Sequence, residues 1–166
     1  MHPRDAREMY LEGRPADALK ALEGMLAADA DYIEALRLKG NILEVAALEQ
    51  ADRDQDTPLK HPGMWEARRC YERILQLDPD NTLALIDLGD HFGNLYAYEK
   101  AEDFYQRAIA LLERGVSRWS LGDEIQEVFD ALADLYDETG RTPLAQTTRD
   151  RQAELLTRLP PAEPAD

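Results

Sequence analysis

Apolar residues recur three and four positions apart along most of the chain, which is the period of an amphipathic α-helix. Leu85, Leu88 and Phe92 form one such series, and Ala101 and Tyr105 begin another. No segment of four or more residues alternates between apolar and polar positions while being rich in β-branched and aromatic side chains, as a strand would. The pattern therefore predicts an all-α protein.

Clusters of Gly, Pro, Asp and Asn separate the periodic stretches, at 13–15, 78–81 and 140–143. These residue types stop and start helices, so the clusters mark helix boundaries. We expect a single helical domain over 1–158, followed by a disordered Pro-rich tail over 159–166. The expected helices span 3–12, 15–28, 31–52, 63–77, 81–94, 97–114, 122–139 and 142–158.

The apolar pattern of 82–115 returns elsewhere in the chain at fixed offsets. One small residue recurs in the first helix of each unit, at Gly40, Gly89 and Ala133. A second recurs in the following helix, at Ala18, Ala67, Ala101 and Ala145. Small residues let two helix backbones approach closely. The chain thus divides into units at about 1–30, 31–80, 81–115 and 122–158, with insertions near 50–63 and 116–125.

The clearest unit carries Leu85, Leu88, Gly89 and Phe92, followed by Ala101, Tyr105 and Ala108, and it comes after a turn at 78–81. This series resembles the tetratricopeptide repeat family, whose unit is a helix-turn-helix of about 34 residues. The resemblance covers about 13–158. It implies a right-handed α-solenoid of stacked antiparallel helix pairs, with about seven or eight helices. In the last helix, Arg149 and Gln152 replace Tyr105 and Ala108, as a polar terminal helix requires.

Acidic residues dominate the charge of this 166-residue chain, with 34 Asp and Glu against 19 Lys and Arg and a net charge of −15. That balance argues against nucleic acid and anionic membrane surfaces as partners. A single cysteine excludes an internal disulfide and any multi-cysteine zinc site. No apolar run has the length of a membrane span and the N-terminus has no apolar signal region, so we expect a soluble cytoplasmic protein.

No catalytic combination of residues stands out. His2, His61 and His91 are scattered, and His91 falls among apolar positions, where a packed helical histidine is expected. Cys70 stands where a small buried residue belongs. Asp52, Asp54 and Asp56 lack the glycine and the closing glutamate of a calcium loop. We expect no enzymatic activity, no cofactor and no metal.

In tetratricopeptide proteins the first helix of each pair lines a concave groove that holds an extended peptide or a helix. The resemblance therefore implies a partner-binding groove, and the acidic stripe from Glu127 to Glu138 falls on it. The stripe is either a dock for a basic segment or a solvated acidic face. Carried over by position, the groove residues are Glu34, Arg37, Asn41, Asp87, Asp90, Asn94, Glu127, Asp130, Asp134 and Asp137.

One mode of the family, the grip on a C-terminal carboxylate, can be compared by position. Arg37 and Asn41 match the first part of that clamp, but Asp87, Glu127 and Ala131 stand where Asn, Lys and Arg are needed. We therefore predict that this chain has no such clamp.

Two functions follow from the resemblance. The first is a non-enzymatic interaction module, or adaptor, that binds a basic or mixed peptide or helix in an acidic concave groove. The second is a self-associating structural subunit or assembly scaffold, because a short first helix is expected to leave Ala18, Leu22 and Met25 uncovered. An enzymatic role has the least support, since it needs a pocket and perturbed titratable groups.

Overall fold

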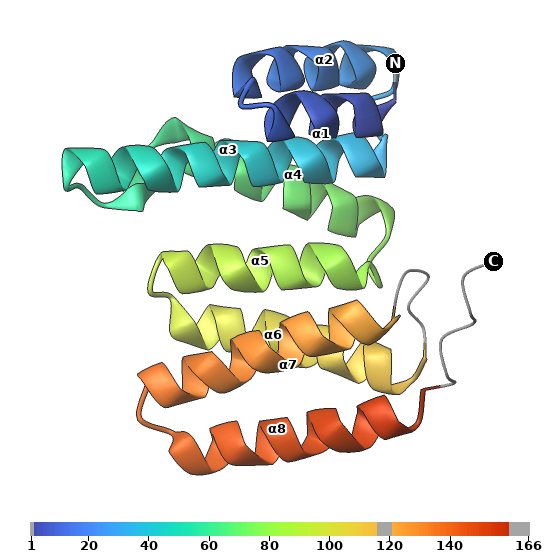
Figure 1. Ribbon diagram of the computed structural model, residues 1–166, viewed down its shortest axis with the longest axis vertical. Helices are drawn as coiled ribbons and strands as arrows, with labels where there is room; N and C mark the ends of the chain where they lie inside the picture. The colour runs from blue at the N-terminus through green and yellow to red at the C-terminus, as the bar shows by residue number, and fades with distance from the viewer. Residues whose placement is uncertain (1, 116–120, 160–166) are drawn as a thin grey trace.

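The computed structural model describes residues 2–115 and 121–159, and every regular element in them is a helix. Figure 1 shows the helices stacked one after another along the long axis of the molecule. The elements are α1 (Pro3–Leu11), α2 (Pro15–Ala28), α3 (Ile33–Asp54), the single 3₁₀ turn η1 (Pro58–Lys60), α4 (Pro62–Leu77), α5 (Thr82–Asn94), α6 (Tyr98–Glu113), α7 (Leu121–Glu138) and α8 (Thr142–Thr157).

All eight expected helices are present, and their ends lie within two residues of the expected ones. Proline occupies the first turn of α1, α2, α4 and α8, where its missing N–H costs no helical hydrogen bond. At the start of α5, the Asn81 side chain accepts a hydrogen bond from the Ala84 N–H. Residues 116–120 of the expected second insertion and 160–166 of the expected tail lie outside the described residues.

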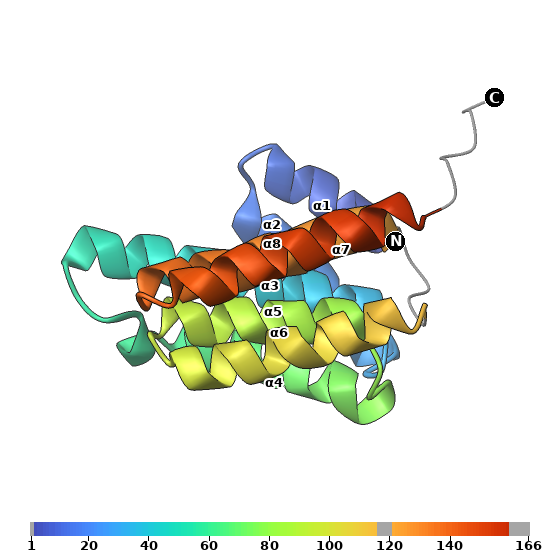
Figure 2. The ribbon, with the colours of Figure 1, turned by 90° about the horizontal axis from the view of Figure 1, so that it is seen from below.

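The helices pair in chain order, α1 with α2, α3 with α4, α5 with α6 and α7 with α8. The first helices also touch one another, since α3 contacts both α1 and α5, and α5 contacts α7. In Figure 2, α4 and α6 lie together on one side of α3 and α5. The first helices therefore form a continuous inner face, and the predicted all-α solenoid of helix pairs is confirmed.

The crossing of the two helices within a unit depends on glycine facing tyrosine. A Cβ atom on Gly89 would lie 2.3 Å from Cε1 of Tyr105, and one on Gly40 would lie 2.5 Å from Cε1 of Tyr71. The last unit has Arg149 at the tyrosine position, and there the crossing residue is Ala133, fully buried. The small residues of the repeat thus leave room for the ring opposite.

The expectation of uncovered apolar surface in the first unit was wrong. Ala18, Leu22 and Met25 are all buried. They form one apolar cluster with Ala6 of α1 and with Ala35 and Ile42 of α3. Although α1 has only nine residues, it and α3 suffice to cover this side of α2.

No helix of the described residues combines the length and the apolar character that a bilayer span requires.

Candidate protein-binding groove

A groove of about 610 Å³ lies on the inner face, where α1, α3 and the start of α5 come together. Two of its lining side chains are exposed and apolar, Leu11 at 74% and Val45 at 40%. Leu38 and Leu83 line it as well and are half-buried. Exposed apolar side chains gathered in one concave place mark a surface that can bury a partner's apolar groups.

Most of the ionisable side chains that line this groove are basic. Arg4 and Arg7 come from α1, Arg37 comes from α3, and His2 precedes α1. Glu34 is the one carboxylate among its lining residues in the described chain. The acidic concave groove expected from the sequence is therefore not found in this part of the inner face. The cause is α1, whose two arginines precede the residues that the family resemblance covers.

Arg37 is fixed by a paired hydrogen bond to a buried carboxylate on the next repeat. Its Nε donates to Oδ2 of Asp87 at 2.6 Å, and its second guanidinium nitrogen, Nη2, donates to Oδ1 at 3.0 Å. Burial raises the pKa of Asp87 to about 6, although Arg37 acts in the opposite direction. Asp87 thus lies beneath the groove and orients Arg37, rather than facing a ligand.

Deeper between α3 and α5 lies a buried polar pair. His91, only 1% exposed, places Nδ1 3.4 Å from Oε1 of Glu44, an ion-pair distance without hydrogen-bond geometry. Asn94 donates its amide to the same Glu44 oxygen at 3.1 Å. The His91 ring also packs edge-on against Tyr71 and Phe92. His91 is packed as the sequence predicted, and Asn94, itself exposed, holds Glu44 through its amide.

The same repeat position makes the same hydrogen bond in three units. Tyr71 donates its hydroxyl to Asn41 at 2.9 Å, and Tyr105 donates its hydroxyl to Asp90 at 2.7 Å. In the last unit the guanidinium of Arg149 reaches Asp134 at 3.4 Å. Asp90 is largely buried, which raises its pKa to about 7 despite the hydrogen bond from Tyr105.

The acidic stripe on α7 is partly occupied by side chains of α8. Arg149 pairs with Asp137 at 2.8 Å as well as with Asp134, and Gln152 donates to Asp130 at 2.8 Å. Glu127 remains exposed. The stripe has no basic residue on its own helix, but the packing of α8 supplies one. None of these residues lines the groove of α1, α3 and α5.

The structure therefore separates the ten predicted residues into three places. Glu34, Arg37 and Asn41 line the groove. Asp87 and Asp90 are bonded between α5 and its neighbours α3 and α6, and the exposed Asn94 at the end of α5 bonds to Glu44 of α3. Glu127, Asp130, Asp134 and Asp137 lie on α7.

Sequence reasoning missed Arg4, Arg7 and Leu11 in the groove. Their spacing of three and four residues places them on one helix face and is the signal that could have found them.

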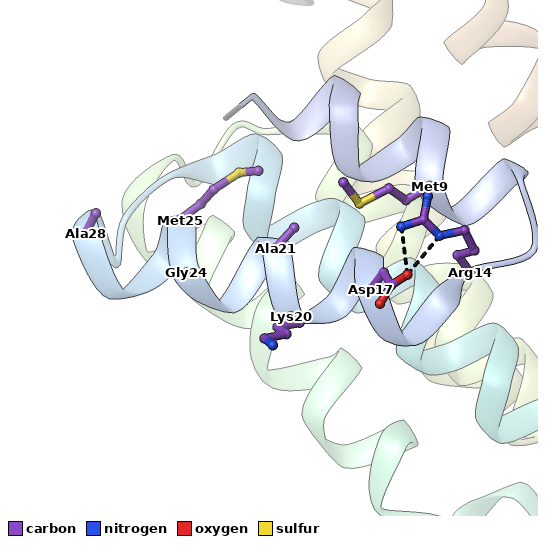
Figure 3. A pocket seen from close by; sticks show the side chains of 8 residues that line it. All are labelled: Met9, Arg14, Asp17, Lys20, Ala21, Gly24, Met25 and Ala28. Atoms are coloured by element: carbon purple, nitrogen blue, oxygen red, sulfur yellow. Dashed lines mark hydrogen bonds and ion pairs between the residues drawn. The ribbon is translucent and has the colours of Figure 1, made fainter.

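A second hollow of about 640 Å³ lies along the outer side of α2 (Figure 3). Met9 and Met25 give it apolar lining, while Arg14 and Asp17 bond to each other at 2.8 Å. The guanidinium of Arg14 and the carboxylate of Asp17 are therefore already paired with each other. Among the described residues, no group of three or more His, Cys, Asp or Glu is placed to hold a metal ion.

MamA shares this fold. A mutant form of MamA matches with a TM-score of 0.58 and 20% sequence identity, over 92% of this chain and 74% of that chain. A second MamA structure, of MSR-1, matches with a TM-score of 0.54 and 20% identity, over 90% and 72%. At this identity the likeness shows the helical-repeat fold alone. No protein-family model and no curated protein sequence matches the chain.

Proposed function

We propose that this protein is a non-enzymatic interaction module, an adaptor or scaffold component, that binds a segment of a partner protein on its inner face. The groove of α1, α3 and α5 supports this proposal, because Leu11 and Val45 are exposed inside it. A peptide or helix that inserts apolar side chains there would remove both from water, at about 25 cal/mol for each Å² of apolar surface buried.

The groups with perturbed pKa values serve structure in this proposal. Asp87 is held by Arg37 and Asp90 is held by Tyr105, and both bonds join neighbouring helices. A general acid or base needs a proton path to a substrate, whereas these carboxyls face partners within the chain. We therefore assign them to the shape of the inner face.

One interpretation of the acidic stripe on α7 is a docking site for a basic segment. Arg149 and Gln152 already bond to three of its carboxylates, which reduces the attraction left for a partner. The groove of α1, α3 and α5 offers apolar contact in addition to charge, so we place the principal binding surface there. Self-association is the alternative, although the buried first unit removes the observation that suggested it.

The test is selection of twelve-residue peptides from a random display library against the full chain, followed by affinity measurement through fluorescence anisotropy. Val45→Ser and Leu11→Ser should each weaken the selected peptides at least tenfold, because these side chains bury apolar surface on binding. Leu144→Ser is the matched control, since Leu144 is a comparably exposed residue on α8, away from the groove. Equal losses in all three variants would contradict the proposed site.

A further inference from the structure

The ionisable side chains that line the groove are mostly basic, although the protein as a whole is acidic. The protein carries a net charge of −15, yet the groove is lined by three arginines and a histidine against one glutamate. A surface region of average composition in this protein would be acidic. The basic lining is therefore a local property that α1 and α3 create together.

The two arginines of α1 are available to a ligand. Arg4 has only an exposed ion pair with Glu8 at 3.5 Å, a kind of contact that contributes little to stability. Arg7 is exposed and makes no ion pair or side-chain hydrogen bond with any described residue. Both guanidinium groups can therefore turn to an incoming carboxylate without breaking a strong contact.

Arg37 supplies a further N–H donor that is already oriented, while Asp87 balances its charge. Two of its nitrogens are bonded to the buried Asp87, and Nη1 has no hydrogen bond to the described residues. A side chain held in this way loses little conformational entropy when it binds a further acceptor. Its position on α3 places it beside the apolar lining residue Leu38.

We infer that the occupant of this groove is an acidic protein segment, whose side-chain carboxylates contact the arginines while its apolar side chains cover Leu11 and Val45. This inference rests on the proposed function and specifies its partner. A basic segment would bring its cations next to Arg4 and Arg7, of which only Arg4 has a carboxylate partner in the described residues, the exposed Glu8.

Two fluorescein-labelled twelve-residue peptides, both amidated at the C-terminus, test the inference. They carry leucine at the same four positions, with glutamate in one and lysine in the other at four further positions. The glutamate peptide should bind the full chain at least tenfold more tightly in fluorescence anisotropy. Amidation removes the terminal carboxylate, so the measurement reports on side-chain carboxylates alone.

Variants then assign the binding to the groove. The double variant Arg4→Gln, Arg7→Gln should weaken the glutamate peptide at least tenfold, and Arg7→Lys should retain most of the affinity of the unaltered chain. Arg69→Gln is the control, because Arg69 is an exposed arginine of α4 that carries the same charge and has no ion pair with the described residues. It should change the affinity less than twofold.

The possible failures are distinguishable. Tighter binding of the lysine peptide that remains sensitive to Val45→Ser would overturn the acidic partner and leave the proposed function standing. Binding that is insensitive to both Val45→Ser and the arginine variants would overturn both. A concentration-dependent dimer in sedimentation velocity that Arg7→Gln dissociates would assign the groove to a second copy of this chain and overturn the inference.

Discussion

At the scale of single residues, the repeat is held by a pairing between the small residue of one helix and the large residue of the next. Gly40 faces Tyr71 and Gly89 faces Tyr105, and each ring occupies the space that a Cβ would need. Each of these tyrosines also donates its hydroxyl to the inner-face residue that follows the glycine, Asn41 or Asp90. One side chain therefore sets both the helix spacing and the orientation of a polar group on the inner face.

Gly89→Ala should destabilise the protein by about 1–3 kcal/mol, because the added methyl group overlaps the Tyr105 ring and the helices must move apart. The measurement is urea unfolding followed by circular dichroism. Gly24→Ala is the matched control, because Gly24 lies inside α2 with no atom near its Cβ position. That variant should be neutral or more stable by up to about 1 kcal/mol. A similar effect of both substitutions would contradict the packing argument.

Asp90 makes the stability depend on pH. Burial raises its pKa to about 7, so between an ordinary pKa near 3.8 and pH 7 the folded state binds more protons than the unfolded state. Its contribution to stability is therefore most favourable at the acidic end and falls as pH rises through this window. Asp87, with a pKa raised to about 6, acts in the same direction.

Asp90→Asn should stabilise the protein at pH 8 by on the order of 2 kcal/mol, because it removes a buried charge and keeps an acceptor for Tyr105. The corresponding Asn41 already accepts such a bond from Tyr71. The gain should shrink toward zero near pH 4, where the native carboxyl is protonated. Chemical unfolding at pH 8, 6 and 4.5 measures it, and a difference that stays constant across these pH values would contradict the assignment.

At the scale of elements, the last helix completes the charge balance of the helix before it. Like charges three and four residues apart on α7 repel one another, and α8 places Arg149 beside two of them. The sequence shows Arg149 as a departure from the tyrosine of the repeat. In the structure this departure favours stability, because Arg149 gives the terminal helix a polar contact at the position where the preceding units have a tyrosine ring.

Arg149→Met should lower the melting temperature at low salt, and the difference from the unaltered chain should shrink in 1 M NaCl, since salt screens the repulsion left on α7. Differential scanning calorimetry at the two salt concentrations measures this. Arg158→Met serves as the control, because Arg158 has only a 4.0 Å contact with Glu154 at the end of the same helix. A salt-independent loss would indicate a packing effect of the Arg149 stem.

At the scale of the whole molecule, each helix pair packs against the pairs next to it in the stack, as in other solenoids. The largest apolar cluster spans the second half of the chain, from α4 to α8, and a smaller one joins α1, α2 and α3. The proposed groove lies at the end with the smaller cluster. Binding there would add a contact surface to α1 beyond those with α2 and α3.

Amide hydrogen exchange should therefore show α1 opening with a lower free energy than α5, because α1 is short and lies at the end of the stack. Mass spectrometry of exchanged peptides measures this for the full chain. The glutamate peptide should slow exchange in α1 and in the first half of α3, while α8 stays unchanged. Uniform protection along the chain, or protection by the peptide confined to α7 and α8, would contradict this picture.

The positions of the helices could be read from the sequence because they depend on local physics. A period of three to four, prolines in first turns and an asparagine cap act within a few residues of the chain. The same holds for the small residues at the helix crossings. The repeat pattern predicted which helices pair and the order in which the pairs stack. The fold class therefore followed from the repeat, and the helix ends followed from the local signals.

The tertiary structure decided which charged side chains are paired and which line the groove. The spacing of Arg4, Arg7 and Leu11 places them on one helix face, but only the packing of α1 on α3 brings that face to the groove. Arg37 and Asp87 are 50 residues apart in the chain, and Arg149 and Asp137 are 12 apart, yet each pair is joined. An electrostatic surface depends on which charges face water and which are already paired, and no periodicity carries that information. The −15 of the sequence therefore states the total charge, while packing decides that a basic groove lies within it.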